Sequence, residues 1–563
     1  MKDQSCSFPR SVRPSALGSG GEVRPAGAWS GRAMAHMHYK YNQLHSAAEE
    51  YSRKPLPLQL DYAPLGVLAV LEVQRELHRP WTPLSCLRRP RIYSFVFGLT
   101  VMFLIMASYV LSTERKALLL TPSPYHADPS LTPGTLLFNL SSDGDRTQIR
   151  QVLHHILSKV DFSPRKLPDL RTLVHSEPHM FSVVPRVFLP EAKNPCWYQQ
   201  VLGNVSVDPY RRNLYTVYYK RSRIAFHFLR SSFRKHLLQR NGSFYRIRCL
   251  PYFYIIGQPK CGTTDLYDRL RMHPDVRVTA LKEPHWWTRK RFGIVRPSDG
   301  LGVRCPVEDY LDLFDFPAHQ IQDRLLSNSS RGSNQANIII GEASASTMWD
   351  NNAWIYLFDN LTEREPPFLI QDFLHTLQPD ARFIAILRDP VERLYSDYLY
   401  FGMANKSSED FHEKVWESLQ LFDACLQEFS MRACVYNGSL NNAMPVRLHV
   451  GVYVVYVLDW LSVFGRDQLL VLRLEDHSAD PRLSMHKVFQ FLDLRPLSEQ
   501  KEAEIRKRPA SNTRRLADKN LGPMLPLTRE ILSDFYRPFN RKLADVLQHD
   551  SFLWDSTHRS PKG

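Results

Sequence analysis

The segment GQPKCGTT, residues 257–264, has the residue types and spacing of an anion-binding loop. Glycines let the backbone approach an anion closely, and a helix that opens at Thr263 and Thr264 presents free N–H groups and a positive dipole. Lys260 adds a full positive charge. The loop is not a Walker A motif, because Gly262 stands where that motif has its lysine. The pattern predicts a phosphate or sulfate cradle, with a glycine–proline turn and a solvated lysine as the plainer alternative.

A second polar cluster, LKEPHWWTRKRFG, follows at residues 281–293. Glu283 is the candidate general base, with His285 two residues after it. Cations and bulky rings around a carboxylate suit a sugar that carries anionic groups. The candidates for such contacts are Lys282, Trp286, Trp287, Arg289, Lys290 and Arg291. A surface ion-pair cluster over core tryptophans, or a nucleic-acid surface, would have a similar composition.

The third segment is ILRDPVERLYSDY, residues 386–398. Arg388 stands where an apolar run ends, and Ser396 follows about two turns into the next helical stretch. An arginine and a hydroxyl at such a corner can hold a second phosphate. Asp389 and Pro390 also form an ordinary helix start, which requires no function.

Short apolar runs alternate with helical patterns through the carboxyl part of the chain. The expected strands are residues 253–257, 337–342, 381–389 and 468–476, and the expected helices are residues 263–273, 390–401 and 481–493. Strands that alternate with helices predict an α/β domain with a parallel sheet. Ligands bind at the carboxyl ends of such strands, where the three polar segments lie.

Residues 92–111 are twenty residues without a charge, enough for a helix of ~30 Å, the thickness of a bilayer's apolar core. Arg88, Arg89 and Arg91 precede this segment, which favours a cytoplasmic amino end. All N-x-Ser/Thr sequons follow it, as expected of a lumenal carboxyl part. They are Asn139, Asn204, Asn241, Asn328, Asn360, Asn405 and Asn437. The sequence predicts a single-pass type II membrane protein.

The predicted organisation has five parts: a cytoplasmic tail over 1–91, a transmembrane signal-anchor helix over 92–111, a lumenal stem over 112–164, a globular domain over 165–555 and a carboxyl tail over 556–563. The first part carries 13 basic and 7 acidic residues and low-complexity stretches, which are typical of disorder.

Composition narrows the class of protein. The length of 563 residues excludes a mini-protein, and 23% charged with 12% aromatic residues excludes a wholly disordered chain. The formal net charge is +15. The positive charge indicates an anionic partner, and the lumenal topology argues against nucleic acid. Eight cysteines are too few for a disulfide scaffold. Cys425 and Cys434 are the candidate local pair, and Cys261 is expected to stay free.

The three segments, in this order, resemble the sulfotransferase superfamily, whose members take sulfate from 3′-phosphoadenylyl sulfate (PAPS). KEPHWWTRKRFGIVR and GEASASTMWDNNAW are most similar to glycosaminoglycan sulfotransferases that add a 6-sulfate to 4-sulfated GalNAc of chondroitin or dermatan sulfate. The resemblance covers roughly residues 160–555. It implies an α/β, P-loop-like sulfotransferase fold with a central parallel sheet flanked by helices, preceded by a single transmembrane helix. It also implies an enzyme of the Golgi membrane that forms E-type disulfated units.

The resemblance implies roles for individual residues. Lys260 would contact the transferred sulfuryl group and the leaving phosphate, and Glu283 would be the catalytic base, with His285 beside it. The 5′-phosphosulfate would lie against Lys260, Cys261, Gly262, Thr263 and Thr264, and the 3′-phosphate against Arg388 and Ser396. The candidate for the family's late nucleotide-binding loop is SNTRR, with Asn512, Arg514 and Arg515.

Three alternatives remain open. They are a heparan sulfate sulfotransferase, a P-loop kinase, and an inactive glycosaminoglycan-binding membrane protein on the same fold. The missing lysine before Thr263 weighs against the kinase, and the presence of Lys260, Glu283 and Arg388 weighs against the inactive protein. The sequence has no metal-ligand spacing, so no structural metal is expected, and a homo-oligomer is left open.

Overall fold

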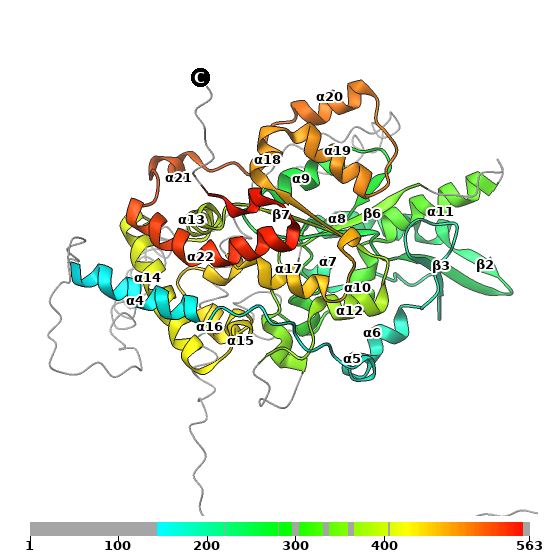
Figure 1. Ribbon diagram of the computed structural model, residues 1–563. Coiled ribbons are helices and arrows are strands. Elements are labelled where there is room, and N and C mark those ends of the chain that lie inside the picture. Colours follow the sequence, from blue (N-terminus) through cyan, green and yellow to red (C-terminus); the bar gives the residue numbers. More distant parts are fainter. Residues whose placement is uncertain are drawn as a thin grey trace, which may run out of the picture. The chain divides into compact units, whose positions relative to one another are not determined.

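The computed structural model describes residues 143–218, 220–279, 281–294, 303–329, 337–357, 365–402 and 406–555 (Figure 1). The predicted cytoplasmic tail, the apolar segment 92–111 and the carboxyl tail lie outside the described residues. Among the helices that are described, none has the length and apolar character needed to cross a membrane.

A five-stranded parallel sheet with the order β5-β6-β4-β7-β8 is the centre of the domain. Its strands are β4 (Phe253–Gly257), β5 (Val276–Val278), β6 (Ile339–Ala343), β7 (Arg382–Leu387) and β8 (Leu469–Arg473). The four strands expected from the apolar runs are confirmed. The edge strand β5 was missed because three residues are too few to form a recognisable pattern.

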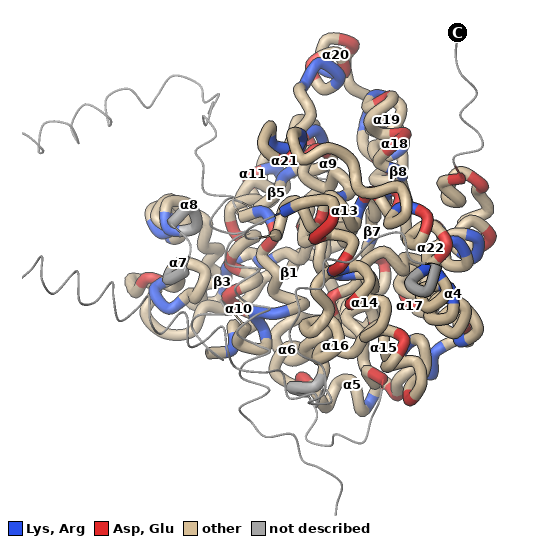
Figure 2. Tube along the Cα trace, turned by 90° about the vertical axis from the view of Figure 1, so that its left-hand side faces the viewer, with Lys and Arg blue, Asp and Glu red and all other residues tan. Residues whose placement is uncertain are grey.

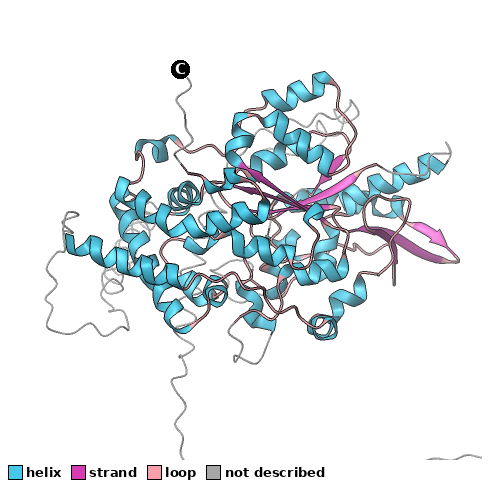
Figure 3. Cartoon of the chain, viewed as in Figure 1, coloured by secondary structure: helices cyan, strands magenta, loops and turns pink. Residues whose placement is uncertain are grey.

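The two faces of the sheet bury two separate apolar clusters, because successive side chains of a strand point in opposite directions. Phe253 and Ile255 face one cluster, and Tyr254 and Ile256 face the other. Helices cover both faces (Figure 3). On the first face lie α9 (Thr263–Leu270), α19 (Pro481–Phe491) and α20 (Glu499–Lys507), and on the second lie α12 (Ile370–Leu377), α13 (Pro390–Phe401), α14 (Ser408–Glu428), α17 (Tyr453–Leu461) and α22 (Pro526–Leu547). The predicted α/β fold with a central parallel sheet is confirmed.

The remaining helices are shorter or lie outside this layer. They are α4 (Asp143–Ser158), α5 (Leu170–Ser176), α6 (Pro178–Val183), α7 (Leu214–Tyr218), α8 (Lys220–Ser232), α10 (Val307–Asp312), α11 (Asp315–Ser329), α15 (Met431–Val435), α16 (Gly438–Ala443), α18 (Leu474–Ala479) and α21 (Leu516–Asn520). The 3₁₀ helices are η1 (Phe233–His236), η2 (Lys290–Phe292), η4 (Asn352–Leu357), η5 (Leu448–Gly451), η6 (Arg466–Gln468) and η7 (Asp550–Leu553).

A small antiparallel sheet was not foreseen. Its strands are β1 (Cys196–Gln200), β2 (Leu238–Arg240) and β3 (Ser243–Cys249), with β3 in the middle. Cys196 and Cys249 lie directly opposite each other in the β1–β3 register and form a disulfide. The predicted pair Cys425–Cys434 also forms a disulfide, and Cys261 is free and buried, as expected.

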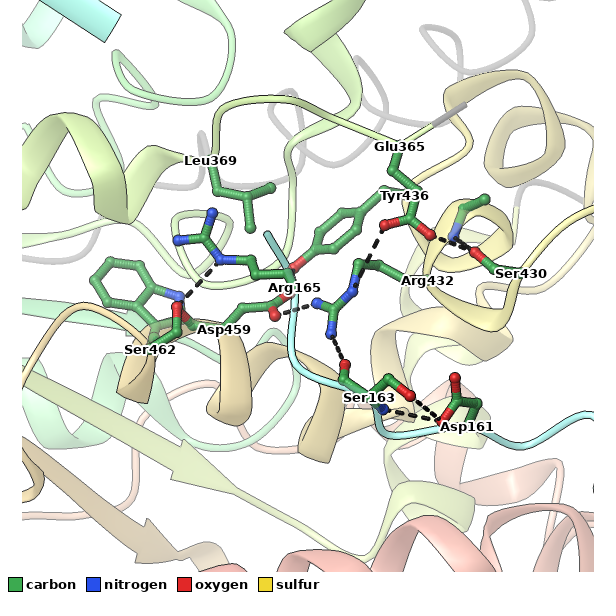
Figure 4. A network of polar contacts seen from close by, with 12 residues as sticks. Asp161, Ser163, Arg165, Glu365, Leu369, Ser430, Arg432, Tyr436, Asp459 and Ser462 are labelled. Carbon is green, nitrogen blue, oxygen red and sulfur yellow. Dashed lines mark hydrogen bonds and ion pairs between the residues drawn. The ribbon is translucent and has the colours of Figure 1, made fainter. Parts of the chain in front are cut away.

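The folded unit begins before residue 165. Within the predicted stem, Ile156 of α4 is fully buried in the core. Farther along, the Arg432 guanidinium donates to the Ser163 carbonyl at 3.0 Å and also pairs with Asp459 and Glu365 (Figure 4). Arg165 pairs with Asp372 of α12. This end of the predicted stem is therefore fixed to the domain.

Candidate active site

The carboxyl ends of three adjacent strands, β6, β4 and β7, carry the polar segments that the sequence singled out. The loop of Lys260 follows β4, and Arg388 follows β7. Glu283 is placed by its backbone N–H, which donates to the Ala343 carbonyl at the end of β6 at 2.9 Å. The three segments therefore meet at one edge of the sheet, although Lys260 and Arg388 are 128 residues apart in the sequence.

The cradle between β4 and α9 has the backbone geometry of an anion site. Lys260 has φ +67°, and Gly262 caps α9 with φ +89°. A Cβ at Gly262 would lie 2.6 Å from Leu474 Cδ1, so only glycine fits there without rearrangement. Thr263 and Thr264 open α9, whose free N–H groups and dipole attract an anion. The cradle therefore fits a phosphate or sulfate group.

The late loop, residues 511–515, reaches this cradle. Asn512 Nδ2 donates to Thr264 Oγ1 at 3.1 Å. The Arg514 guanidinium lies 5.4 Å from the ring centroid of Tyr395 in α13, and Arg515 Nη2 donates to the Leu399 carbonyl at 3.0 Å. The loop thus spans the space between α9 and α13, the helices that follow the cradle and Arg388.

Asp265 fixes the late loop to α9. Its carboxylate accepts hydrogen bonds from the Ser511 N–H at 2.9 Å and from Arg269 Nε at 2.7 Å, and its Oδ2 lies 2.9 Å from His477 Nε2. Burial by itself would raise the pKa of Asp265, but these hydrogen bonds lower it to about 2. A charged Asp265 therefore connects the first and last parts of the site.

Lys260 lies among other cations. Burial, together with the nearby Arg388, Arg447 and Arg515, lowers the pKa of Lys260 to about 8, although Asp397 opposes this shift. Arg388 Nη2 lies 3.4 Å from Glu392 Oε2, and half-buried Ser396 lies on α13 farther along. Such a concentration of positive charge suits a ligand with several phosphates or sulfates.

Tyr400 links the cradle to Glu283. The Lys260 Nζ lies 3.5 Å from the centroid of the Tyr400 ring, a cation–π contact. Burial raises the pKa of the Tyr400 hydroxyl, and the nearby Glu283 carboxylate raises it further. The half-buried Tyr400 ring that Lys260 contacts is therefore also within electrostatic range of the Glu283 carboxylate.

Glu283 and its neighbours form a compact polar group. Glu283 Oε1 accepts from Lys282 Nζ at 2.6 Å, and Glu283 Oε2 lies 3.7 Å from His285 Nε2. Burial and three nearby cations hold the pKa of His285 well below its usual value, so the ring is neutral near pH 7. Glu283 and His285 have φ values of +60° and +50°. Left-handed backbone at non-glycine residues is often found at functional sites.

Comparison with known proteins identifies the family. The family model of the sulfotransferase domain matches residues 250–542. Human carbohydrate sulfotransferase 15 is 55% identical over 517 residues, which cover 89% of this chain and 92% of that protein. The chain belongs to the sulfotransferase family. It is thus a sulfotransferase enzyme, and the resemblance inferred from the three segments is confirmed.

Two further comparisons match about half of the chain. The mouse bifunctional heparan sulfate N-deacetylase/N-sulfotransferase 4 is 26% identical over 53% of the chain and 30% of its own length. The crystal structure of a sulfotransferase from Alicyclobacillus acidocaldarius is 22% identical, covers 54% of this chain and 97% of its own, and has a TM-score of 0.34.

Five residues that were expected to contact the acceptor are buried in the interior of the sulfotransferase. Trp286 and Trp287 are 3% and 2% exposed, and their indole N–H groups donate to the Cys305 carbonyl and the Tyr310 hydroxyl. The three cations that follow are also at most 8% exposed: Arg289 pairs with Asp350, Lys290 lies over Tyr215, and Arg291 lies among aromatic rings. Burial argues against direct contact between these five side chains and an acceptor, and their role in acceptor binding stays a prediction. Lys282 remains at the site.

Sequence reasoning missed the polar residues at the end of β6. Glu342 Oε1 accepts from Ser344 Oγ at 2.6 Å, and Ser344 Oγ in turn accepts from the His285 N–H at 3.1 Å. Ser346 Oγ lies 2.7 Å from His285 Nδ1. Burial raises the pKa of Glu342 to about 7. The run GEASAS, residues 341–346, which begins within β6 and continues past its end, was the signal that could have identified these residues behind Glu283.

Asp265→Asn should weaken the attachment of the late loop. The change keeps the shape of the side chain but removes the negative charge that pairs with Arg269. A hydrogen bond to a charged group contributes about 1.5–3 kcal/mol. We expect a loss of about that size in the free energy of unfolding at neutral pH. Because the folded pKa is lowered to about 2, the contribution is present above pH ~4 and is lost as the pH falls through about 2.

Denaturant unfolding between pH 2 and pH 7 measures this effect. The control is Asp476→Asn, because Asp476 is also paired with an arginine but is 57% exposed. An Asp265→Asn variant as stable as the wild type at pH 7 would contradict the role of Asp265.

Proposed function

We propose that this sulfotransferase transfers sulfate from PAPS to the 6-hydroxyl of GalNAc 4-sulfate in chondroitin or dermatan sulfate, which forms E-type disulfated units. The similarity to carbohydrate sulfotransferase 15 over nearly the whole relative supports the substrate class. The lower identity and coverage of the heparan sulfate relative weigh against that acceptor.

The observation that carries the proposal is that the loops of Lys260 and Glu283 lie at the carboxyl ends of the adjacent strands β4 and β6. A donor anion in the cradle would have its transferable group beside Lys260. An acceptor hydroxyl that reaches this group from the other side would meet the Glu283 carboxylate. The site thus offers a cation for the leaving phosphate and a base for the attacking oxygen.

The chemistry follows from these two side chains. In an in-line transfer the acceptor oxygen bonds to sulfur as the bond from sulfur to the donor's phosphate oxygen breaks. Negative charge grows on that phosphate oxygen, and the Lys260 ammonium stabilises it more in the transition state than in the ground state. Glu283 accepts the hydroxyl proton, and Lys282 at 2.6 Å holds the carboxylate in place. Adenosine 3′,5′-bisphosphate then leaves the cradle.

Disaccharide analysis tests the proposal. The full chain is incubated with ³⁵S-labelled PAPS and one acceptor at a time. The acceptors are chondroitin 4-sulfate, dermatan sulfate, unsulfated chondroitin and heparan sulfate. We expect label in the GalNAc 4,6-disulfate unit from the first two acceptors. Label in heparan sulfate alone, or only at the 4-position of unsulfated chondroitin, would contradict the proposed acceptor.

We further propose that the protein is a type II protein of the Golgi membrane, anchored by residues 92–111 with the sulfotransferase domain in the lumen. Asn204 and Asn241 are exposed, which leaves them accessible for glycosylation. Asn437 caps α16 through its Oδ1. Protease added to intact microsomes should remove only the residues before Arg91. Digestion of the sulfotransferase domain under the same conditions would contradict this orientation.

A further inference from the structure

The segment 209–240 is strongly basic. It contains nine Lys and Arg and no Asp or Glu. It forms α7, α8, η1 and β2. Figure 2 shows basic residues near α7 and α8. A run of positive charge without intervening carboxylates on a folded surface indicates an anionic partner.

Aromatic packing brings the two ends of this segment together. The ring centroid of Tyr210 lies 5.3 Å from that of Phe226 and 6.0 Å from that of Phe233. The two arginines that follow Tyr210 therefore lie near the two cations that follow Phe233. These four residues, Arg211, Arg212, Arg234 and Lys235, are called the basic surface below.

The basic surface is available for binding. Its four side chains are exposed, and none forms an ion pair with any residue in the described part of the chain. Arg230 differs, because it pairs with Asp208 at 2.6 Å. Within the described residues, the nearby carboxylates of Asp208 and Asp323 pair with Arg230 and His236 rather than with these four cations.

The same segment is fixed to the loop of the candidate base. The Tyr215 hydroxyl of α7 donates to the Pro284 carbonyl at 3.1 Å, one residue after Glu283. Asn213 anchors the start of α7 through a hydrogen bond of 2.9 Å to Asp312. The basic segment is therefore attached to the acceptor side of the active site, whereas the late loop and Arg388 belong to the donor side.

We propose that the basic surface is a secondary binding site for the sulfated acceptor polysaccharide, outside the catalytic centre. The inference rests on the proposed function. A long chain that binds near Glu283 can also reach the basic surface, and the second contact then benefits from a high effective concentration. A short oligosaccharide occupies only the catalytic centre. The apparent affinity should therefore rise with acceptor length.

Charge removal tests this site in the full chain. The variant Arg211→Ser/Arg212→Ser/Arg234→Ser/Lys235→Ser should raise the KM for polymeric chondroitin 4-sulfate by about tenfold or more. Each contact between a cation and the polyanion releases about one counterion on binding. Loss of these contacts should therefore lower the slope of log KM against log salt by about 2 to 4. KM for a tetrasaccharide and kcat should stay near the wild-type values. Arg211→Lys/Arg212→Lys/Arg234→Lys retains the charge and should behave like the wild type.

The matched control removes four exposed cations elsewhere, Arg146, Arg150, Arg506 and Lys507, which have no ion pair within the described residues. An equal rise in KM in this control, or no rise in the test variant, would overturn the proposal. A wild-type chain that sulfates neither acceptor would instead contradict the proposed function.

An anionic lipid surface is the rival partner. The full chain is therefore also assayed in phosphatidylcholine nanodiscs with and without phosphatidylserine. A variant effect that depends on phosphatidylserine and not on acceptor length would assign the surface to lipid and overturn the proposal.

Discussion

Lys260→Ala is expected to lower the turnover of sulfate transfer by about 10²-fold or more. Loss of one preorganised group that stabilises the charge developing in a transition state has an effect of this size. Lys260 lies in the loop after β4 with a left-handed backbone, next to the opening of α9, where a donor phosphate would be held. The measurement is kcat with saturating PAPS and chondroitin 4-sulfate. Lys193→Ala is the control. The Lys193 side chain is likewise largely buried, and it forms an ion pair with Asp493.

The wild-type pH profile gives a second readout for the same residue. Since the pKa of Lys260 is lowered to about 8, its ammonium is present below pH 8 and is lost as the pH rises through that value in the free enzyme. The wild-type kcat/KM for PAPS should therefore fall above about pH 8, and the Lys260→Ala profile should lack this step. Near-normal turnover in Lys260→Ala would contradict the assignment of the cradle.

Glu283→Gln should lower turnover by about 10²-fold or more while it leaves the binding of adenosine 3′,5′-bisphosphate nearly unchanged. The amide keeps the size of the side chain but no longer accepts the hydroxyl proton, and general base catalysis contributes about 10²–10⁴-fold. Calorimetric titration of the bisphosphate and steady-state turnover separate the two effects.

Glu308→Gln is the matched control for this variant. Glu308 has a side-chain exposure of 34% against 38% for Glu283, and it is paired with His179 at 2.8 Å, away from the cradle. Full turnover in Glu283→Gln would show that another group takes the proton. His285, 3.7 Å from Glu283, and Glu342 would then be tested in the same way.

The parts of the fold that were predicted have strong local signals. Four sheet strands consist mainly of apolar residues, and α13 begins at Pro390 after an Asp389 cap, so apolar runs and capping locate these elements. The antiparallel sheet has mixed polar strands, such as Ser243–Cys249, that local patterns do not distinguish from loops. Its disulfide pairs cysteines 53 residues apart, which no spacing rule foretells.

Sequence patterns located the candidate site residues that follow the strands, but they did not show which polar residues of the site are buried. Lys260, Glu283, Arg388 and Asn512 meet because parallel strands end at the same edge and because Asp265 ties the late loop to α9. A one-dimensional pattern does not reveal whether a polar run faces solvent. Arg289 therefore looked like a free cation, although the buried Asp350 is its partner.

A single-turnover experiment tests the central claim most directly: that Lys260 and Glu283 act on one sulfate transfer to a 4-sulfated GalNAc. The full chain is preloaded with ³⁵S-labelled PAPS and mixed with a chondroitin 4-sulfate tetrasaccharide, and the label at the GalNAc 6-position is followed in time. The account predicts a single fast transfer to that position in the wild type, and transfer about 10²-fold slower in both Lys260→Ala and Glu283→Gln. Transfer to another position, or wild-type rates in both variants, would contradict it.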